Sequence, residues 1–221
     1  QSIDPVGRRM TYVYSTNLVD LLEIWQTTGT NNDLLARMVY DSRHLPLLVT
    51  DAAGQTTTNA YNARGQLVAT TNALGQPRTF TYDTNGYLLA IDGPLPGTND
   101  TTRFTYDAMG RLRTITEVDG YTIIYAYDNL DRLTNITNPD GSFEAYTFDK
   151  LDRVAARDRM GRVSRYTYNA LRQITSETDP LNRTNRFNYC DCGSTSDLID
   201  ASGRMTIWRY DVQGRITEKE H

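Results

Sequence analysis

The chain has 221 residues, of which 38% are hydrophobic, and 23 Lys and Arg against 27 Asp and Glu give a net charge of -4. This composition predicts a folded protein of one large or two small domains; it argues against an electrostatic nucleic-acid binder, and no run approaches the ~18 apolar residues of a membrane span. Fifteen Tyr and fifteen Gly favour strands and turns over helices.

The N-terminus, Gln1-Ser2-Ile3, has neither a starting Met nor the pattern of a signal peptide. We therefore expect the chain to be a piece of a longer protein.

An aromatic residue, in most cases followed by Asp or Asn, recurs through the chain. Six of the nine intervals between successive copies are 21 residues long, so the sequence consists of a repeated unit. We call these aromatic residues the anchors. They are Tyr14, Tyr40, Tyr61, Tyr82, Tyr106, Tyr127, Phe148, Tyr168, Tyr189 and Tyr210.

Each anchor is predicted to end the first strand of its repeat. Eight of the ten residues two positions before the anchors are aromatic, as in the pairs Phe104 and Tyr106 or Tyr125 and Tyr127. Side chains two residues apart share one face of a strand, whereas Thr105 points to the other face. We expect aromatic ladders across the sheet and therefore a structural role for the tyrosines.

A four-residue turn follows each anchor, as in NARG at 62–65, DTNG at 83–86, DAMG at 107–110 and DVQG at 211–214. Asp or Asn in the first position accepts local backbone hydrogen bonds, and Gly in the fourth position adopts the positive φ that closes the turn into a hairpin. The chain is predicted to reverse at each of these first turns.

A second strand then begins with an apolar residue such as Leu112 or Leu133. In these two repeats another apolar residue, Ile115 or Ile136, follows three positions later. This odd spacing places the two on opposite faces of a regular strand, so either a β-bulge realigns them or both faces are partly covered. The sequence does not choose between these alternatives.

A second turn of the same kind closes the repeat, for example DAAG at 51–54, NALG at 72–75 and DPLN at 179–182. The two longest intervals place their extra residues in this turn, as loops at 27–33 and 93–100. Because these loops are the least repetitive surface, they are the best candidates for specific recognition.

The predicted fold is all-β: antiparallel β-hairpins of 21 residues, repeated in tandem and forming a strip one strand wide. A strip of ~18 twisted strands does not stay flat, so we expect a curved, spiralling sheet without helices beyond a turn or two. The whole chain, 1–221, is predicted to be a single repeat array with an irregular first repeat at 14–39.

The basic residues are 21 Arg and only two Lys, Lys150 and Lys219. The planar guanidinium fork pairs with carboxylates and stacks on aromatic rings, so the skew suits an Asp- and Tyr-rich surface of fixed geometry. A genomic composition bias explains it equally well.

The segments YDAMGRLRTITEVDG at 106–120, YDNLDRLTNITNPDG at 127–141 and YDVQGRIT at 210–217 resemble the YD repeats, or RHS repeats, of bacterial Rhs and insecticidal toxin-complex proteins and of animal teneurins. The resemblance covers nearly the whole chain and is firmest from Tyr61 to Thr217. It implies a β-ribbon wound as a spiral into a hollow shell, which encloses a toxic C-terminal domain in the bacterial members. In teneurins it implies a barrel in an extracellular adhesion receptor, so the resemblance alone points to a secreted or cell-surface location.

Some turns depart from the repeat. His44, Asp131, Asp152 and Arg172 stand in place of the first-turn Gly, and in CDCG Cys190 replaces the opening Asp. We expect these turns to be more strained or differently closed.

We assign no catalytic, cofactor or metal residue from the sequence. The family's self-cleaving segment has no counterpart here, and the repeated Asp residues are explained by their turns. His44 and His221 are expected to be solvated. Cys190 and Cys192 are expected to be free thiols, because so tight a loop strains a disulfide and two thiols fall short of the four ligands of a structural zinc site.

Two hypotheses for the function follow. The first is a non-enzymatic structural module, a segment of an RHS-repeat shell that encapsulates or presents a C-terminal toxin or effector domain; its partners are the rest of the shell and the enclosed domain. The alternative is a cell-surface adhesion or carbohydrate-binding module that recognises glycans or protein receptors through aromatic rows, Trp208 or the loops at 27–33 and 93–100. An enzyme ranks third, and no cofactor or nucleic-acid partner is expected.

Overall fold

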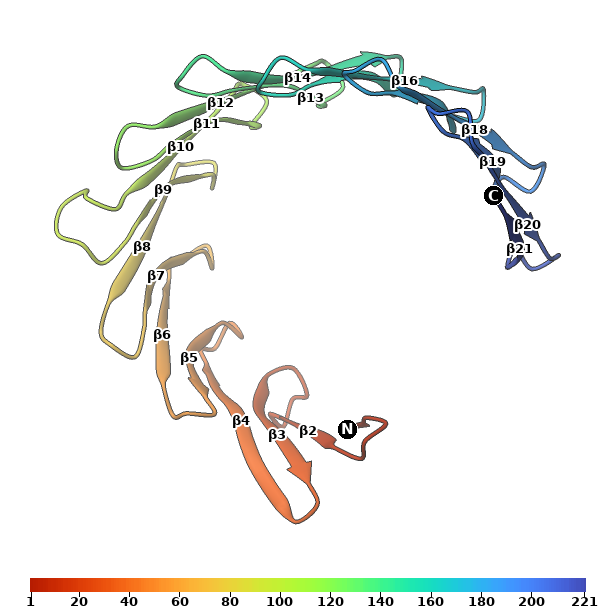
Figure 1. The fold of residues 1–221 in the computed structure, drawn as a ribbon. Coiled ribbons are helices and arrows are strands. Elements are labelled where there is room, and N and C mark those ends of the chain that lie inside the picture. The colour runs from red at the N-terminus through yellow and green to blue at the C-terminus, as the bar shows by residue number, and fades with distance from the viewer. The chain divides into compact units, whose positions relative to one another are not determined.

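The structure is a computed structural model that describes all residues from 1 to 221, and it consists of strands and turns without a helix (Figure 1). The strands are β1 (Ser2–Ile3), β2 (Arg9–Tyr14), β3 (Leu21–Thr28), β4 (Asn31–Tyr40), β5 (Pro46–Asp51), β6 (Thr56–Tyr61), β7 (Leu67–Thr71), β8 (Pro77–Tyr82), β9 (Leu88–Asp92), β10 (Thr102–Tyr106), β11 (Leu112–Thr116), β12 (Thr122–Tyr127), β13 (Leu133–Thr137), β14 (Phe143–Asp149), β15 (Asp152–Arg157), β16 (Val163–Tyr168), β17 (Ile174–Thr178), β18 (Thr184–Tyr189), β19 (Thr195–Ile199), β20 (Met205–Tyr210) and β21 (Ile216–Glu220).

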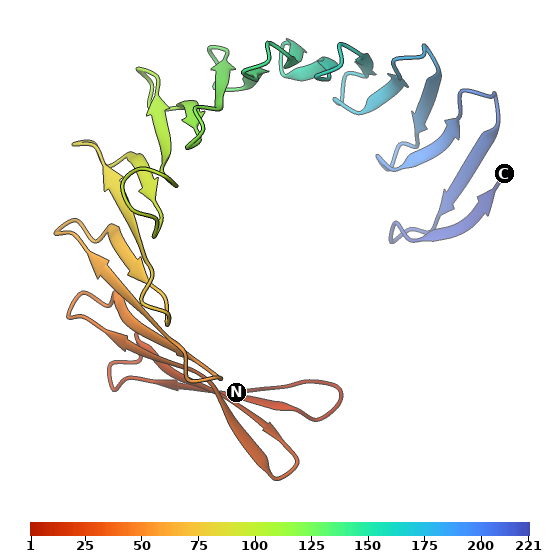
Figure 2. The ribbon, with the colours of Figure 1, turned by 60° about the vertical axis from the view of Figure 1, so that its left-hand side comes forward.

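The chain divides into two compact units, residues 1–106 with 115–120 and residues 107–114 with 121–221. In the first unit β1 to β10 pair antiparallel in chain order, and in the second unit β12 to β21 do the same. Within each unit the strands follow one another in one twisted layer (Figure 2). The prediction of an all-β fold of tandem antiparallel hairpins is confirmed.

A β-bulge lies inside the hairpins, at the anchor. Tyr125 pairs with Ile136 and Tyr127 pairs with Leu133, so Thr134 is one residue more than the first strand can match. Because Tyr125 and Tyr127 share a face, their partners Leu133 and Ile136 share it too. Of the two alternatives for the three-residue spacing, the structure therefore shows the bulge.

Successive repeats are joined by a shorter ladder than the one inside each hairpin. β7 and β8 pair only over Ala69, Thr70 and Thr71, and Leu67 lies beyond the end of this ladder. A backbone carbonyl at that place lacks a partner from the next strand and needs another donor or water.

The anchor tyrosine supplies that donor. Tyr82 donates its hydroxyl to the carbonyl oxygen of Leu67, the residue that pairs with the preceding anchor, Tyr61. The same bond, 2.8–3.1 Å long, recurs in both units. The pairs are Tyr40 to Leu21, Tyr61 to Pro46, Tyr82 to Leu67, Tyr106 to Leu88, Tyr168 to Arg153, Tyr189 to Ile174 and Tyr210 to Thr195.

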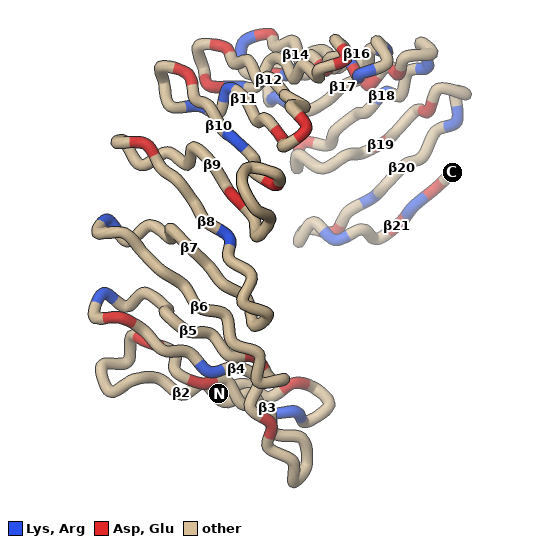
Figure 3. Tube along the Cα trace, turned by 90° about the vertical axis from the view of Figure 1, so that its left-hand side faces the viewer, with Lys and Arg blue, Asp and Glu red and all other residues tan.

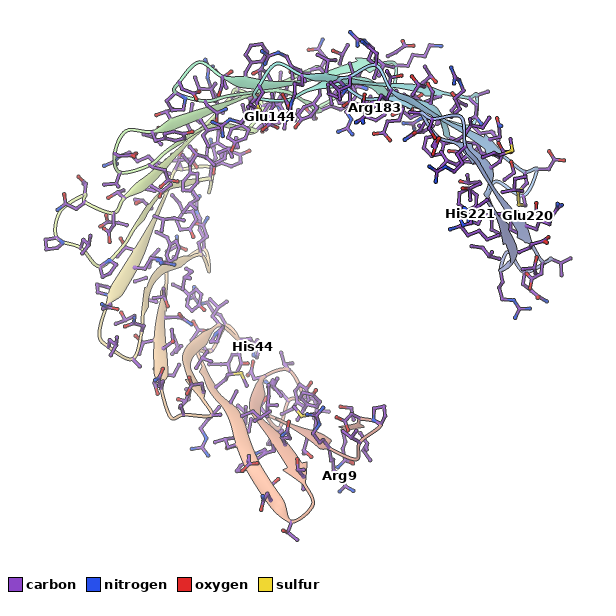
Figure 4. All side chains as sticks on the ribbon, viewed as in Figure 1. Arg9, His44, Glu144, Arg183, Glu220 and His221 are labelled. Carbon is purple, nitrogen blue, oxygen red and sulfur yellow. A yellow bond between two sulfur atoms is a disulfide. The ribbon has the colours of Figure 1, made fainter.

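The sheet encloses no conventional core. Ala90 is the one hydrophobic residue that is buried, and the chain exposes 14771 Å² of surface, against about 10,300 Å² for a compact protein of this size. Side chains project from both faces of the layer and no second layer covers them (Figure 4). Stability must therefore come mainly from contacts between neighbouring strands and turns.

The anchor bond gives a direct prediction. Tyr189→Phe removes the donor to the Ile174 carbonyl, so we expect the free energy of unfolding, measured in urea, to fall by about 1 kcal/mol. Tyr166→Phe is the matched control, because Phe80, Phe104 and Phe187 already occupy the equivalent position. Equal destabilisation by both substitutions would refute a specific role for the anchor hydroxyl.

Candidate functional site

The polar chemistry of the chain is concentrated in the turns at the two edges of the sheet, where acidic and basic residues gather (Figure 3). Asp179 is typical. Its Oδ1 accepts hydrogen bonds from the N–H groups of Leu181 and Arg183, each at 2.9 Å, and its Oδ2 accepts one from Arg183 Nε at 2.7 Å. Asn72 holds the N–H groups of Leu74 and Gln76 in the same way at 3.0 Å. The predicted role of the Asp or Asn that opens a turn, which is to accept hydrogen bonds from nearby backbone N–H groups, is confirmed.

These hydrogen bonds keep the carboxylates charged. The backbone N–H of Arg183 and then its guanidinium lower the pKa of Asp179, and the Ser202 hydroxyl, followed by the Arg204 N–H, lowers the pKa of Asp200. The pKa is lowered likewise for six further turn-opening acids. These are Asp4, Asp41, Asp107, Asp128, Asp158 and Asp211. A general acid for glycoside hydrolysis needs the opposite shift, so these groups suit turn formation better than acid catalysis.

Side chains of one first turn also bond to the next first turn along the edge. The guanidinium of Arg111 donates to the carbonyl of Asp128 at 2.9 Å, while it also pairs with Asp107 of its own turn. Gln66 and Gln173 use their amides in the same way. The full set of these donors and their acceptor carbonyls is Arg43 to Asn62, Arg64 to Thr84, Gln66 to Gly86, Arg111 to Asp128, Arg132 to Lys150 and Gln173 to Gly193.

Residues that replace the turn Gly take part in the same network. His44, Asp131 and Arg172 adopt φ of 60–64°, close to the glycine conformation. Asp131 accepts a bond from Arg111, Arg172 bonds to Asp152, and His44 Nδ1 lies 2.9 Å from Asp20 Oδ1. These turns are closed as in the Gly repeats, with an added contact to a neighbouring turn. His44 is exposed, as expected, and its ring also contacts Asp20.

The turn at 149–152 closes differently. Asp149 pairs directly with Asp152, which leaves a two-residue hairpin of Lys150 and Leu151, with the positive φ at Lys150. This tighter turn lies within the single 20-residue interval, from Phe148 to Tyr168. The repeat is thus shortened by one residue at the hairpin tip, and the next anchor bond, from Tyr168 to Arg153, is kept.

Arginine lies over five aromatic side chains of the second unit, whereas in the first unit the rings of Tyr87 and Tyr106 stack on each other. The guanidinium carbon of Arg132 lies 4.1 Å from the centre of the Phe148 ring, and Arg111 lies 4.9 Å from Tyr127. The anchors lie on every second strand, about 10 Å apart, so their rings cannot stack on one another. In the second unit, the predicted aromatic ladders are therefore corrected to contacts between rings and guanidinium groups.

The prediction of free thiols is wrong. Cys190 and Cys192 form a disulfide, because the turn brings their Cα atoms to 5.1 Å, within the range that a disulfide spans. Cys190 has no side-chain oxygen with which to hold the N–H groups of the turn. The covalent bond takes the place of the Asp side chain in linking the first and third turn positions.

The two inserted segments differ in kind. The segment 27–33 is not a loop: Thr27 and Thr28 belong to β3 and Asn31 to Asp33 belong to β4, so only Gly29 and Thr30 form the tip. The extra residues extend a ladder because each still finds a partner across the hairpin. The segment 93–100 is a loop, in which Asp100 accepts the N–H of Leu95 at 3.0 Å.

Two depressions on the surface are lined mainly by polar residues. One of about 490 Å³ is lined by Glu177, Asp179, Arg183, Asn185 and Asp200, and Asp179 is already paired with Arg183. Another, of about 250 Å³, lies beside Pro94 of the loop 93–100. Neither assembles a nucleophile with a base, and no cluster of potential metal ligands is found.

Together these features define a protein of tandem β-hairpins whose polar groups are used to join one repeat to the next. The sequence profile of the RHS repeat matches residues 61–98, 106–142 and 145–184, more than half of the chain. The chain belongs to the RHS repeat family. No curated protein matches it.

Solved structures share the fold. The crystal structure of TcdB2-TccC3-Cdc42 has a TM-score of 0.60 at 15% identity, over 97% of this chain and 15% of that one. The Tc holotoxin pore of Photorhabdus luminescens has a TM-score of 0.53 at 15% identity, over 98% of this chain and 17% of that one. The chain therefore spans less than a fifth of these proteins. No membrane-spanning helix is found in it.

The turn carboxylates predict how stability depends on pH. The folded pKa of Asp179 lies below its ordinary value of 3.8, so its contribution is complete above pH 3.8 and is lost as the pH falls through the folded pKa. We expect urea unfolding midpoints to be nearly constant around pH 6–7 and to drop below about pH 4. Asp179→Asn should be less stable than the parent chain at pH 7 and should converge with it at low pH; parallel curves would contradict this.

The disulfide turn gives a second prediction. Reduction with dithiothreitol leaves the turn at 190–193 with neither a covalent link nor an oxygen acceptor, so the unfolding midpoint should fall. A chain with Cys190→Asp and Cys192→Ala restores the acceptor for two N–H groups, each worth about 1 kcal/mol, and should be insensitive to dithiothreitol. An unchanged midpoint after reduction of the parent chain would show that the disulfide does not support the turn.

Proposed function

We propose that this chain is a non-enzymatic segment of an RHS-repeat shell that encloses or presents another polypeptide of a secreted or cell-surface protein. The observation that carries this proposal is the single-layer sheet with only Ala90 buried among its hydrophobic residues. A layer of this kind has two accessible faces and no interior of its own. Its use is to separate two spaces, as a wall does.

The chemistry of the chain supports the proposed role as part of a shell. The carboxylates of the turns are engaged by local N–H groups and guanidinium groups, and the anchor hydroxyls by backbone carbonyls. These carboxylates and hydroxyls are therefore already used, the former to close turns and the latter to join repeats. Large half-exposed rings covered by arginine remain available to contact an enclosed chain without demanding a particular sequence from it.

The similar structures support the same proposal. One of them is described as TcdB2-TccC3 without hypervariable C-terminal region, with a TM-score of 0.60 at 15% identity. We extend to this chain the arrangement in which RHS repeats accompany a variable C-terminal segment. The alternative, a carbohydrate-binding module, loses one of its two candidate loops, because the segment 27–33 is paired strand up to its tip at Gly29 and Thr30.

The test is limited proteolysis of the complete gene product from which this chain derives. We expect a segment outside the repeats to resist the protease until the shell is opened. Tyr168→Phe, Tyr189→Phe and Tyr210→Phe combined remove three bonds between successive repeats and should speed its cleavage at least several-fold. The control combines Tyr125→Phe and Tyr166→Phe, which remove no hydrogen bond.

Two results would refute encapsulation. One is cleavage of that segment at the same rate in the intact protein and in isolation. The other is a complete gene product that contains RHS repeats and nothing that they enclose or present.

A further inference from the structure

Four successive first turns of the second unit carry a large, exposed aliphatic side chain at their third position. These residues are Met109, Leu130, Leu151 and Leu171, and they are 56–78% exposed. We call them the aliphatic tip row. The next turn continues it with the exposed Cys192 of the disulfide.

The turns themselves do not require these apolar side chains. In the first unit the same position holds Asn17, Arg43, Arg64 and Asn85. The N–H of Arg64 bonds to Asn62 Oδ1 at 2.9 Å, just as the N–H of Met109 bonds to Asp107 Oδ1 at 2.9 Å. A polar residue serves the turn equally well. The presence of an exposed aliphatic residue in each of four successive first turns therefore has to be explained by something other than turn formation.

The spacing of the row restricts what can cover it. Each repeat contributes two strands, so successive tips lie about 10 Å apart. A partner that meets all four tips must present apolar groups at the same spacing, and a second copy of the row does so. We propose that the aliphatic tip row is a self-association surface on which the row of a second copy docks antiparallel, about a two-fold axis.

The charges beside the row complement one another in this arrangement. The axis lies between the second and third tips, so Leu130 of one copy meets Leu151 of the other. This also brings Lys150, exposed at its hairpin tip, opposite Asp131 of the second copy, whose side chain is 74% exposed while one of its oxygens is bound by Arg111. The two-fold axis makes this pairing twice, whereas a parallel arrangement would set equal charges against each other.

The size of the row indicates a weak, reversible contact. Four side chains of this exposure can bury on the order of 400 Å² per copy, about half of the ~800 Å² per partner in a standard stable interface. The isolated chain should therefore associate only at high concentration. Two rows held in one assembly would associate more readily, because their effective concentration is higher.

Sedimentation velocity of the 221-residue chain, from about 5 to about 500 μM, tests the proposal in a range suited to an interface this small. We expect a shift from monomer to dimer with rising concentration. Leu130→Glu with Leu151→Glu should abolish the shift, and Lys150→Glu should weaken dimerisation several-fold. The matched control is Met160→Glu with Leu181→Glu, which adds the same charge at second-turn tips that are 78% and 71% exposed.

Urea unfolding of each variant checks that it folds like the parent chain. A parent chain that stays monomeric throughout the range overturns the proposal. So does association that survives Leu130→Glu with Leu151→Glu, which would come from another surface such as a strand edge. Loss of association in both double variants would place the second-turn edge in the contact and would overturn the two-fold arrangement.

Discussion

The bond from an anchor hydroxyl to a backbone carbonyl of the preceding repeat, which seven of the ten anchors make, is the interaction on which the rest of the structure depends. A single layer buries too little apolar surface to be held by a core, so each hairpin must be held by its neighbours. The strands of successive repeats pair over only three residues before they diverge, and the Tyr189 hydroxyl closes the gap to Ile174. The first-turn edge adds bonds from Arg111 and from Gln173 to the following turn. Stability is thus built from many equivalent contacts between neighbours.

This arrangement also explains the composition. Arg111 binds Asp107, reaches the next turn and lies over the Tyr127 ring, three tasks that the point charge of Lys cannot combine. The structure therefore favours the geometric reason for the excess of Arg. The faces and the edges of the sheet differ in the residues that they carry. The faces carry rings and threonines, while the edges carry charge, the inserted segments and the exposed aliphatic tips.

Much of the fold follows from the sequence because period and turn chemistry are local properties. The Asp that opens a turn and the Gly that closes it fix where the chain reverses, and the 21-residue spacing fixes how often. The position of the bulge at Thr134 depends on the partner strand, which the spacing of Leu133 and Ile136 alone does not show. The disulfide of Cys190 and Cys192 depends on how closely the turn folds back. The bonds between turns depend on a neighbour about 20 residues away, although the recurrent Arg or Gln after the turn is a signal for them.

The acceptors of the anchor bonds have a further consequence. They are the main-chain oxygens of residues as different as Leu21, Pro46, Arg153 and Thr195, so the bond does not depend on the side chain at that position. A duplicated unit with a Tyr anchor offers a hydroxyl to the unit before it and a carbonyl to the unit after it, and the units on either side of a deleted one can make the same bond. Such a chain can change its length by whole units during evolution without a compensating substitution. Because the acceptor is a backbone carbonyl, the bond between units is kept whatever side chain stands at the acceptor position. The remaining side chains are free to diverge.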